Sequence, residues 1–206
     1  MTEQTMYPMR LLIGIPSYDS MHYSFVESLV NLTRKLDKDG VDFDVLIKGA
    51  TLVYLSRDAI VREACVGEYT HILWLDDDIV FDDGIFDRLN SHGEDFVSGI
   101  CVSRHVENGS CLFSDLKGRK RYTDYPSGLF PIEGCGFACV LMRTTLARTI
   151  INHHGTCFMP FPEFGEDLAF CKRLNDFGYS MYADSDVKVG HIAKAVVYPN
   201  EKPALL

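Results

Sequence analysis

The pattern of hydrophobic and polar positions along the 206-residue chain predicts an alternation of strands and helices. Apolar runs predict buried strands at 11–15, 43–47, 71–75, 96–101 and 137–142. Apolar residues spaced three and four apart predict helices at 24–38, 57–66, 85–89, 144–151 and 168–177. Two short strands are expected at 181–183 and 187–189, and a hairpin or loop at 102–131.

This order of elements predicts the fold class. Strand and helix in alternation are typical of an α/β fold with a mostly parallel central sheet that is flanked by helices, as in Rossmann-like proteins. Functional groups in such sheets gather at the carboxyl ends of the strands. No internal repeat or linker interrupts the pattern, so we expect a single domain over 1–206, with a polar leader at 1–9 and a short C-terminal tail at 193–206.

The composition is that of a globular protein with an uneven charge. Hydrophobic residues make up 47% of the chain, and 20 Lys+Arg against 29 Asp+Glu give a net charge of −9. A net negative charge disfavours broad, sequence-independent binding of nucleic acid, which requires a basic face. Nine acids and one base lie between Glu68 and Asp95, so this segment carries −8 of the charge. Such crowded carboxylates either face solvent or surround a bound cation.

Several sequence features favour a cytoplasmic location. No apolar run approaches the length of a membrane span, and the first nine residues lack the pattern of a secretory signal. The seven cysteines are scattered, and no two are spaced as Cys-x-x-Cys. Buried free thiols in a reducing compartment are therefore expected, rather than a zinc or redox motif.

The strongest local pattern is a buried strand that runs directly into Asp76, Asp77 and Asp78. Side chains two positions apart in an extended chain project to the same side, so the carboxylates of Asp76 and Asp78 would both point to one side of the strand. Two hard oxygen ligands suit Mg²⁺ or Mn²⁺, which commonly complete their shell with substrate phosphates. A solvated acidic turn without a metal is the alternative.

Three further patterns carry candidate chemistry. Glycines at 134 and 136 precede a predicted strand and permit close approach of the backbone to a ligand, although a simple turn explains them equally well. Glu166 and Asp167 directly precede a predicted helix, where capping alone is an alternative function. His191 follows a short predicted strand and is a candidate nitrogen ligand, although a lone histidine is usually structural.

Taken together and in this order, the motifs resemble those of the glycosyltransferases with the GT-A fold, in particular the family 2-like group. The similarity extends from Leu11 to Ile192. It is carried by the segments 15–18, 56–58, 74–80 with the Asp-x-Asp motif, 134–137, 165–168 and 190–191. Each motif is weak alone, whereas six in the right order are fairly specific.

The resemblance implies a role for each matching residue. Asp78 would be a direct ligand of the divalent cation, with His191 joining its shell and Asp76 nearer the ribose or a metal-bound water. Asp167 would be the general base, and Glu166 would orient the acceptor. The residues implied in donor binding are Pro16, Ser17, Tyr18, Arg57, Asp58 and Asp77. The residues implied in sugar or acceptor binding are Trp74, Gly134, Cys135, Gly136 and Phe137.

The implied activity is metal-dependent transfer of a sugar from a nucleotide-diphosphate sugar, a UDP-sugar by preference, to an acceptor hydroxyl. Inversion is favoured over retention. Two rivals remain: a nucleotidyltransferase, disfavoured because no glycine-rich basic loop follows the first strand, and a non-catalytic module that binds nucleotide or metal. Only 193–206 follow the matching segment, which ends at Ile192, so the acceptor site would be open or closed by another subunit of a homo-oligomer.

A basic cluster lies in the predicted loop, at Lys117, Arg119, Lys120 and Arg121. An exposed, solubilising turn is one interpretation. The other is recognition of an anionic acceptor, such as a phosphorylated glycan, a lipid phosphate or a modified nucleic acid.

Overall fold

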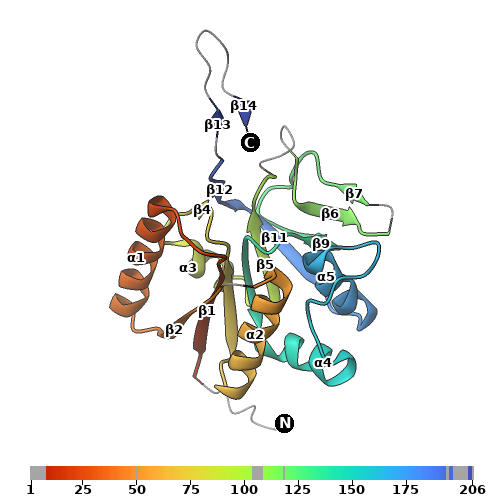
Figure 1. Ribbon diagram of the computed structural model, residues 1–206, viewed down its shortest axis with the longest axis horizontal. Helices are drawn as coiled ribbons and strands as arrows, with labels where there is room; N and C mark the ends of the chain where they lie inside the picture. The colour runs from red at the N-terminus through yellow and green to blue at the C-terminus, as the bar shows by residue number, and fades with distance from the viewer. Residues whose placement is uncertain are drawn as a thin grey trace.

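A computed structural model describes residues 8–49, 51–103, 109–117, 119–193, 195–196 and 204–205. At its centre is a seven-stranded sheet (Figure 1). In spatial order the strands are β2 (Asp42–Lys48), β1 (Arg10–Pro16), β3 (His71–Leu75), β10 (Cys139–Arg143), β5 (Phe96–Ile100), β11 (Met181–Lys188) and β8 (Leu129–Ile132). Five of these strands run in one direction, and β10 and β8 run in the other. The predicted α/β class with a mostly parallel central sheet is confirmed.

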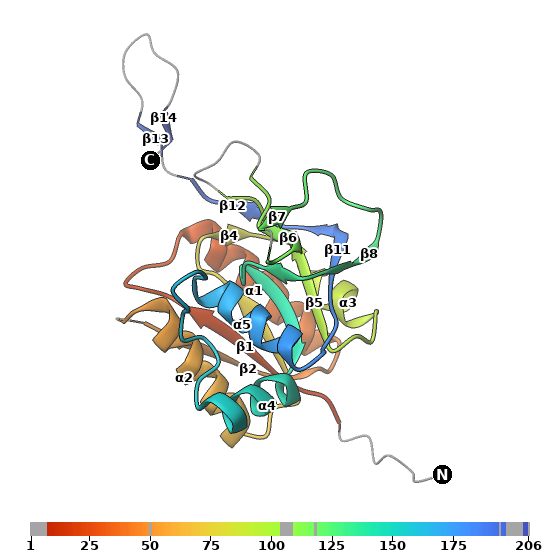
Figure 2. The same cartoon turned by 90° about the vertical axis from the view of Figure 1, so that its right-hand side faces the viewer.

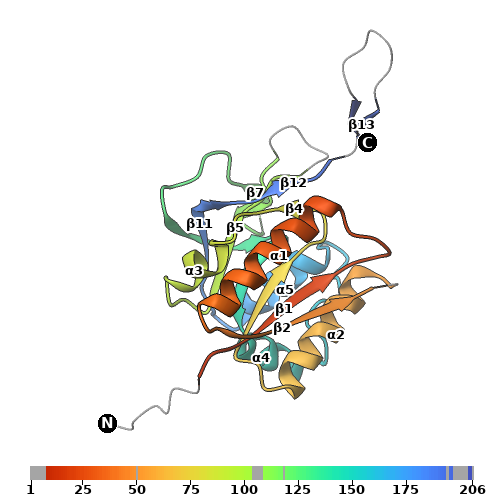
Figure 3. The same cartoon turned by 90° about the vertical axis from the view of Figure 1, so that its left-hand side faces the viewer.

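Helices cover both faces of this sheet, as expected for strands that are buried on both sides. The helices are α1 (Tyr23–Lys38), α2 (Val53–Val66), α3 (Ile85–Asn90), α4 (Thr144–His154) and α5 (Glu166–Asp176). Figure 3 shows α1 and α3 on one face, and Figure 2 shows α4 and α5 on the other, with α2 beside them. Each face has its own hydrophobic cluster, and alternate residues of β1 contribute to the two. The sheet thus separates two cores.

Close packing of α2 on β1 fixes the helix that begins at the candidate site. A Cβ atom at Gly14 would lie 2.7 Å from Ile60 Cγ2, so only glycine lets this helix approach so closely. Ile60 and Val61, two residues of this helix, are fully buried. The first turn of α2 is therefore held rigidly against the carboxyl end of β1.

The structure corrects several predicted boundaries. Helix α2 begins at Val53 rather than at 57, because residues with exposed side chains form its first turn and obscure the periodicity. Helix α5 begins at Glu166, so both acids lie inside it. The two short strands expected near the C-terminus are one strand, β11, with an irregular register between Ala183 and Lys188.

The segment predicted as hairpin or loop contains more structure than expected. Strands β6 (Leu112–Asp115) and β7 (Lys120–Arg121) form a hairpin, which pairs with β9 (Gly134–Cys135) in a separate three-stranded sheet. Strand β8 completes the edge of the central sheet, and Pro131 is tolerated there because an edge strand need not donate every ladder bond.

Two further strand pairs lie near the C-terminus. Strand β4 (Ile79–Val80) pairs with β12 (Gly190–His191), and β13 (Ala195–Val196) pairs with β14 (Ala204–Leu205) apart from the central sheet (Figure 1). Of the expected leader, residues 1–7 lie outside the described residues, as does most of the expected tail. Among the helices that the structure describes, none has the length and hydrophobicity needed to cross a membrane.

Candidate functional site

A cleft of about 440 Å³ opens at the carboxyl ends of β1 and β3. Four segments contribute to its wall: Pro16–Tyr18 after β1, the start of α2, the three aspartates after β3, and the first two residues of α5. Because the parallel strands end at one edge, acids that lie about 90 residues apart in the chain meet here. The acidic run and the Glu166–Asp167 pair therefore share one cavity.

Arg57 lies at the centre of the acidic groups. Its guanidinium donates through Nη2 to Asp76 Oδ1 at 2.8 Å, and through Nη1 to Asp167 Oδ1 and to Glu166 Oε1, the last at 3.4 Å. The Arg57 side chain is only 3% exposed, whereas the three carboxylates are 25–29% exposed. One buried cation thus links the acid that follows β3 to both acids of α5, and its charge offsets their mutual repulsion.

The surroundings of Arg57 keep its guanidinium in place. It lies over the rings of Phe137 and Phe158, 5.5 and 5.8 Å from their centroids. Its Nε is buried and has no hydrogen-bond partner among the described residues. The guanidinium is therefore held between these two aromatic rings and the carboxylates that it contacts.

Asp78 and His191 form the second pair of the site. His191 Nε2 lies 3.2 Å from Asp78 Oδ2, and His191 Nδ1 lies 2.9 Å from the carbonyl oxygen of Val102. The β4–β12 ladder sets this contact, because His191 is opposite Ile79 in its register. A carbonyl oxygen can only accept, so Nδ1 is the donor and Nε2 faces the carboxylate.

The contact with Asp78 also determines the electrostatics of this pair. Hydrogen bonding to Asp78, to the Cys101 thiol and to the Val102 carbonyl raises the pKa of His191 to about 10, although burial opposes the change. Without a cation the imidazole therefore carries a positive charge beside the carboxylate at neutral pH, and a metal ion would bind Nε2 only by displacing its proton.

Asp77 faces a different part of the cleft. Burial raises its pKa, a polar contact with Ser17 opposes this effect, and the neighbouring charges of Asp78 and Asp76 add to the increase. The loop after β1 packs closely against residue 49, which follows β2, because this residue is glycine: a Cβ there would lie 2.8 Å from the Ser17 carbonyl oxygen. Tyr18 is 74% exposed at this end of the cleft, where a planar group could stack on its ring.

The structure brings together most of the residues singled out from the sequence. The cleft itself is lined by Pro16, Ser17, Tyr18, Arg57, Asp76, Asp77, Asp78, Glu166 and Asp167. Gly136 lies beside it, since a Cβ there would be 3.7 Å from Asp167 Oδ2. His191 reaches it through Asp78.

Asp58 is not in the cleft, which corrects the expected contact with a donor. It follows Arg57 by one residue, and one residue turns the side chain by about 100° around a helix. Its Oδ1 accepts from the backbone N–H groups of Cys157 at 2.8 Å and Phe158 at 3.0 Å, and its Oδ2 accepts from the Thr156 hydroxyl. Asp58 therefore anchors the segment after α4.

Trp74 and Phe137 are also corrected, because both belong to the core rather than to a sugar site. Trp74 is fully buried, and its ring lies edge-to-face with Phe137 and Phe158, at 5.9 and 5.4 Å between centroids. Gly134 and Cys135 are buried as well, in the β9 strand. Of this motif, only Gly136 remains beside the cleft.

Sequence reasoning missed the part of the wall that precedes Arg57. Thr51, Leu52, Val53 and Ser56 all line the cleft, and Leu52 is 61% exposed. Their position directly before a helix that carries a candidate arginine was a usable signal. It was lost because the predicted helix began four residues too late.

Comparisons with known proteins show the fold of the chain. No protein-family model matches it, and no curated protein matches it. Among solved structures, A197 from STIV is similar with a TM-score of 0.64 and 21% identity, over 96% of this chain and 94% of that one. The catalytic domain of Drosophila β1,4-galactosyltransferase 7, in complex with xylobiose, gives a TM-score of 0.55 and 15% identity, over 91% and 71% of the two chains.

The apo form of UDP-glucose pyrophosphorylase gives a TM-score of 0.53 and 7% identity, over 89% of this chain and 92% of that one. At these identities the likeness shows a GT-A-like fold. This fold is shared by a glycosyltransferase and a pyrophosphorylase, so the family 2-like resemblance remains a prediction.

Proposed function

We propose that the protein is a metal-dependent glycosyltransferase that moves a sugar from a nucleotide-diphosphate sugar, preferably a UDP-sugar, to an acceptor hydroxyl. The observation that carries the proposal is the single cleft in which the aspartates after β3 meet the carboxylates of α5 through Arg57. The aspartates after β3 could bind a cation, and the carboxylates of α5 could accept a proton. Transfer from a nucleotide sugar requires both.

The chemistry of the donor set fits Mn²⁺ or Mg²⁺. Asp78 and His191 present an oxygen and a nitrogen 3.2 Å apart, close to the separation of adjacent ligands about 2.1 Å from one cation. The bond from His191 Nδ1 to Val102 orients the imidazole, as is usual for metal-binding histidines.

Asp76, which also lines the cleft, would contribute a further oxygen. Within the described residues no three side chains of His, Cys, Asp or Glu are grouped closely enough to hold an ion alone, which suits a site completed by substrate phosphates. When bound, the cation would supply Lewis-acid stabilisation to the departing diphosphate.

The carboxylates of α5 would act on the acceptor. In the proposed step the acceptor oxygen forms a bond to the anomeric carbon, and the bond from that carbon to the phosphate oxygen breaks with its electron pair on the diphosphate. The acceptor proton passes to Asp167. Arg57 occupies Asp167 Oδ1, so Oδ2, on the Gly136 side, is the oxygen that would take the proton. Glu166 would orient the acceptor, and an attack opposite the leaving group would invert the configuration.

Arg57 is a positioning residue in this proposal. This role differs from the donor binding expected from the resemblance. Three carboxylates accept hydrogen bonds from its guanidinium, so few N–H groups remain for a donor phosphate. Pro16–Tyr18 and Asp77 would contact the nucleoside, at the end of the cleft where Tyr18 is exposed.

A thermal-shift experiment tests the metal and donor site. Mn²⁺ and UDP together should stabilise the protein by about 2–3 kcal/mol at 100 times the dissociation constant. Each alone should stabilise it much less, because the two complete one another's site. Asp78→Ala should abolish the joint effect, whereas Asp83→Ala, an exposed acid outside the cleft, should retain it. Stabilisation by Mn²⁺ alone would instead favour a non-catalytic metal-binding module.

An assay of turnover distinguishes the proposed activity from that of a nucleotidyltransferase. A panel of nucleotide sugars should reveal one that is hydrolysed slowly and only with Mn²⁺ or Mg²⁺, with release of the nucleoside diphosphate. A nucleotidyltransferase would instead exchange labelled pyrophosphate into a nucleoside triphosphate. Exchange without release of nucleoside diphosphate would contradict the proposal.

A further inference from the structure

The hairpin formed by β6 and β7 presents a group of cations that the proposed chemistry does not use. We name this segment, 112–121, the basic hairpin; its cations are Lys117, Arg119, Lys120 and Arg121. All four side chains are exposed; Arg119 and Arg121 contact backbone carbonyl oxygens, and Lys120 lies opposite Asp115 in the β6–β7 register. This is notable in a chain with a net charge of −9.

The two arginines of the basic hairpin are oriented by the protein. Arg119 donates from Nη2 to the carbonyl oxygen of Glu163 at 2.7 Å and lies over the Phe164 ring. Arg121 donates from Nη1 to the carbonyl oxygen of Ser110 at 3.0 Å and lies 5.0 Å from the centroid of Phe113. Each uses one of five N–H groups, so a preoriented fork remains for an anion.

The backbone of the basic hairpin turns tightly between its two strands. Arg119 has a φ of +53° and is the last loop residue before β7, and its N–H donates to the carbonyl oxygen of Leu116. A residue in the left-handed region is usual at this point of a short hairpin, so the turn itself fixes where the Arg119 side chain starts.

The basic hairpin also lies against the segment that carries the proposed base. Arg119 contacts Glu163 and Phe164, and the two acids of α5 follow directly after Gly165. Four residues from Glu163 to Asp167 span at most about 14 Å. A group bound by the hairpin can therefore belong to the same molecule as a hydroxyl at Asp167.

We infer that the basic hairpin binds a phosphate group of the acceptor, so that the acceptor of the proposed transfer is a phosphate-bearing hydroxyl compound. The inference rests on the proposed function for the identity of the reaction. The cleft is lined by five carboxylates, and the cations of the hairpin, which contacts the segment just before α5, give the anionic end of the acceptor a place outside it.

The number of cations favours a compact acceptor over a nucleic acid. A protein that makes about 6–10 phosphate contacts shows the strong salt dependence typical of nucleic-acid binding, whereas the basic hairpin offers four cations, two in its loop and two on β7. A sugar phosphate or glycerol phosphate matches this count better.

Binding of an inorganic probe tests the hairpin without any turnover. Triphosphate is titrated calorimetrically into the full chain in EDTA, where no divalent cation can hold it at the carboxylates. We expect Lys117→Gln/Arg119→Gln/Lys120→Gln to weaken binding at least tenfold. Lys117→Gln/Lys120→Gln, which leaves the contacts of both arginines in place, should weaken it severalfold and guards against misfolding.

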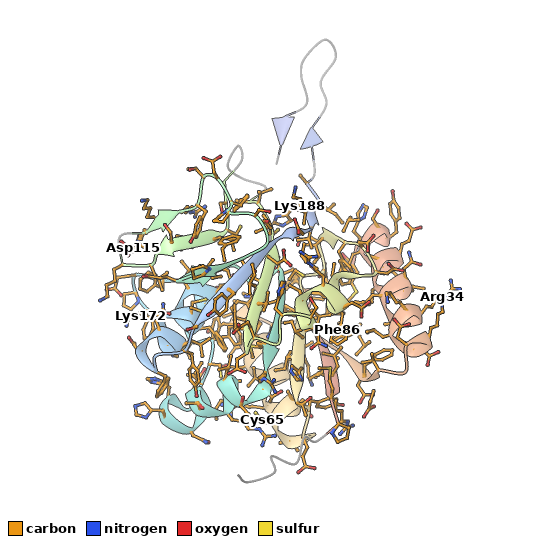
Figure 4. The ribbon with its side chains drawn as sticks, turned by 180° about the vertical axis from the view of Figure 1, so that it is seen from behind. Arg34, Cys65, Phe86, Asp115, Lys172 and Lys188 are labelled. Atoms are coloured by element: carbon orange, nitrogen blue, oxygen red, sulfur yellow. The ribbon has the colours of Figure 1, made fainter. Side chains whose placement is uncertain are left out.

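The matched control is Arg34→Gln/Lys38→Gln, in which two exposed cations of α1 are removed. Arg34 lies on the side of the molecule away from Asp115 at the end of β6 (Figure 4), so binding should not change. Absence of triphosphate binding to the unaltered protein, or equal weakening by the control, would overturn the hairpin as a phosphate site.

Transfer to matched acceptors tests the role of this site. The pairs are glycerol with glycerol 3-phosphate, glucose with glucose 6-phosphate, and a nucleoside with a short oligonucleotide, each with the nucleotide sugar that the panel identifies. We expect kcat/KM to be at least tenfold higher for a small phosphorylated member, and the hairpin variants to remove this advantage through KM while donor hydrolysis is unchanged. Equal transfer within every small pair, or a preference for the oligonucleotide alone, would contradict the inference.

The two proposals can fail separately. Triphosphate binding that depends on the hairpin, in a protein that hydrolyses no nucleotide sugar, would reject the glycosyltransferase and with it the acceptor role. Nucleotide-sugar hydrolysis with no hairpin-dependent binding would reject only the phosphate site.

Discussion

Replacing Arg57 with methionine would remove the cation that three carboxylates share and leave a side chain of similar length against Phe137 and Phe158. Removing one partner of a buried ion pair typically costs about 3–5 kcal/mol, because the remaining charge is left uncompensated. The three acids are 25–29% exposed, so water can partly solvate them. We therefore expect a loss near the lower limit, about 3 kcal/mol at pH 7.

This loss is large enough to measure. It corresponds to a decrease in Tm of roughly 6–12 °C for a chain of this size. Urea unfolding, followed by the fluorescence of Trp74, gives the free energy directly. Arg57→Lys should lose less than Arg57→Met, since the charge stays but a single ammonium cannot contact all three acids.

Arg62→Met is the matched control on the same helix. Arg62 is exposed, and its Nη2 donates to the backbone carbonyl of Gly155 at 2.6 Å. Loss of this single contact should cost about 1 kcal/mol or less. If Arg57→Met were no less stable than Arg62→Met, Arg57 would not be the charge-balancing centre of the site.

Three further outcomes follow from the structure. Asp58→Ala should lower the free energy of unfolding by about 2–3 kcal/mol, because two backbone N–H groups and the Thr156 hydroxyl lose their acceptor; a loss below 1 kcal/mol in urea unfolding would contradict this anchoring role. Burial of His71, and to a smaller extent the charge of Arg143, lowers the pKa of His71 from 6.5 to about 4. Between these two pH values the folded state binds fewer protons than the unfolded state. The free energy of unfolding therefore falls as the pH decreases from about 6.5 to 4. Between pH 7 and pH 5 the unaltered protein should therefore lose about 2 kcal/mol more than His71→Gln, and parallel pH profiles would reject this linkage. Asp167→Asn should keep the joint stabilisation by Mn²⁺ and UDP but slow transfer by roughly 10²–10⁴-fold, and a rate near that of the unaltered protein would remove Asp167 from the role of base.

The sequence predicted the parts of this molecule that depend on local pattern and on the geometry of parallel sheets. The aspartates after 71–75 could be placed at the sheet edge because a buried strand can end only where polar groups meet solvent. Asp167 precedes a helix rather than ending a strand, so only the resemblance placed it in the same site. What no local pattern could predict is the contact of Arg57 with partners 19 to 110 residues away, since it depends on how α2 and α5 pack.

The positions that were predicted wrongly have physical reasons of the same kind. Trp74 lies next to the acidic run in sequence, but it is still within the strand and faces the core, against Phe137 and Phe158. Asp58 lies next to Arg57 but a third of a helical turn away from it. The small sheet of β6, β7 and β9 escaped prediction because its strands are two to four residues long and are stabilised by partners about 20 residues away.

The pairing of β4 with β12 has a consequence for the order in which the molecule is made. Every strand of the central sheet is complete by Lys188, and His191 follows in the next strand along the chain. A ribosome therefore delivers the carboxylates of Asp76 and Asp78 more than a hundred residues before the imidazole that meets Asp78. During synthesis Asp78 therefore remains without this imidazole over that interval. The contact between Asp78 and His191 can thus form only after every strand of the central sheet has been synthesised.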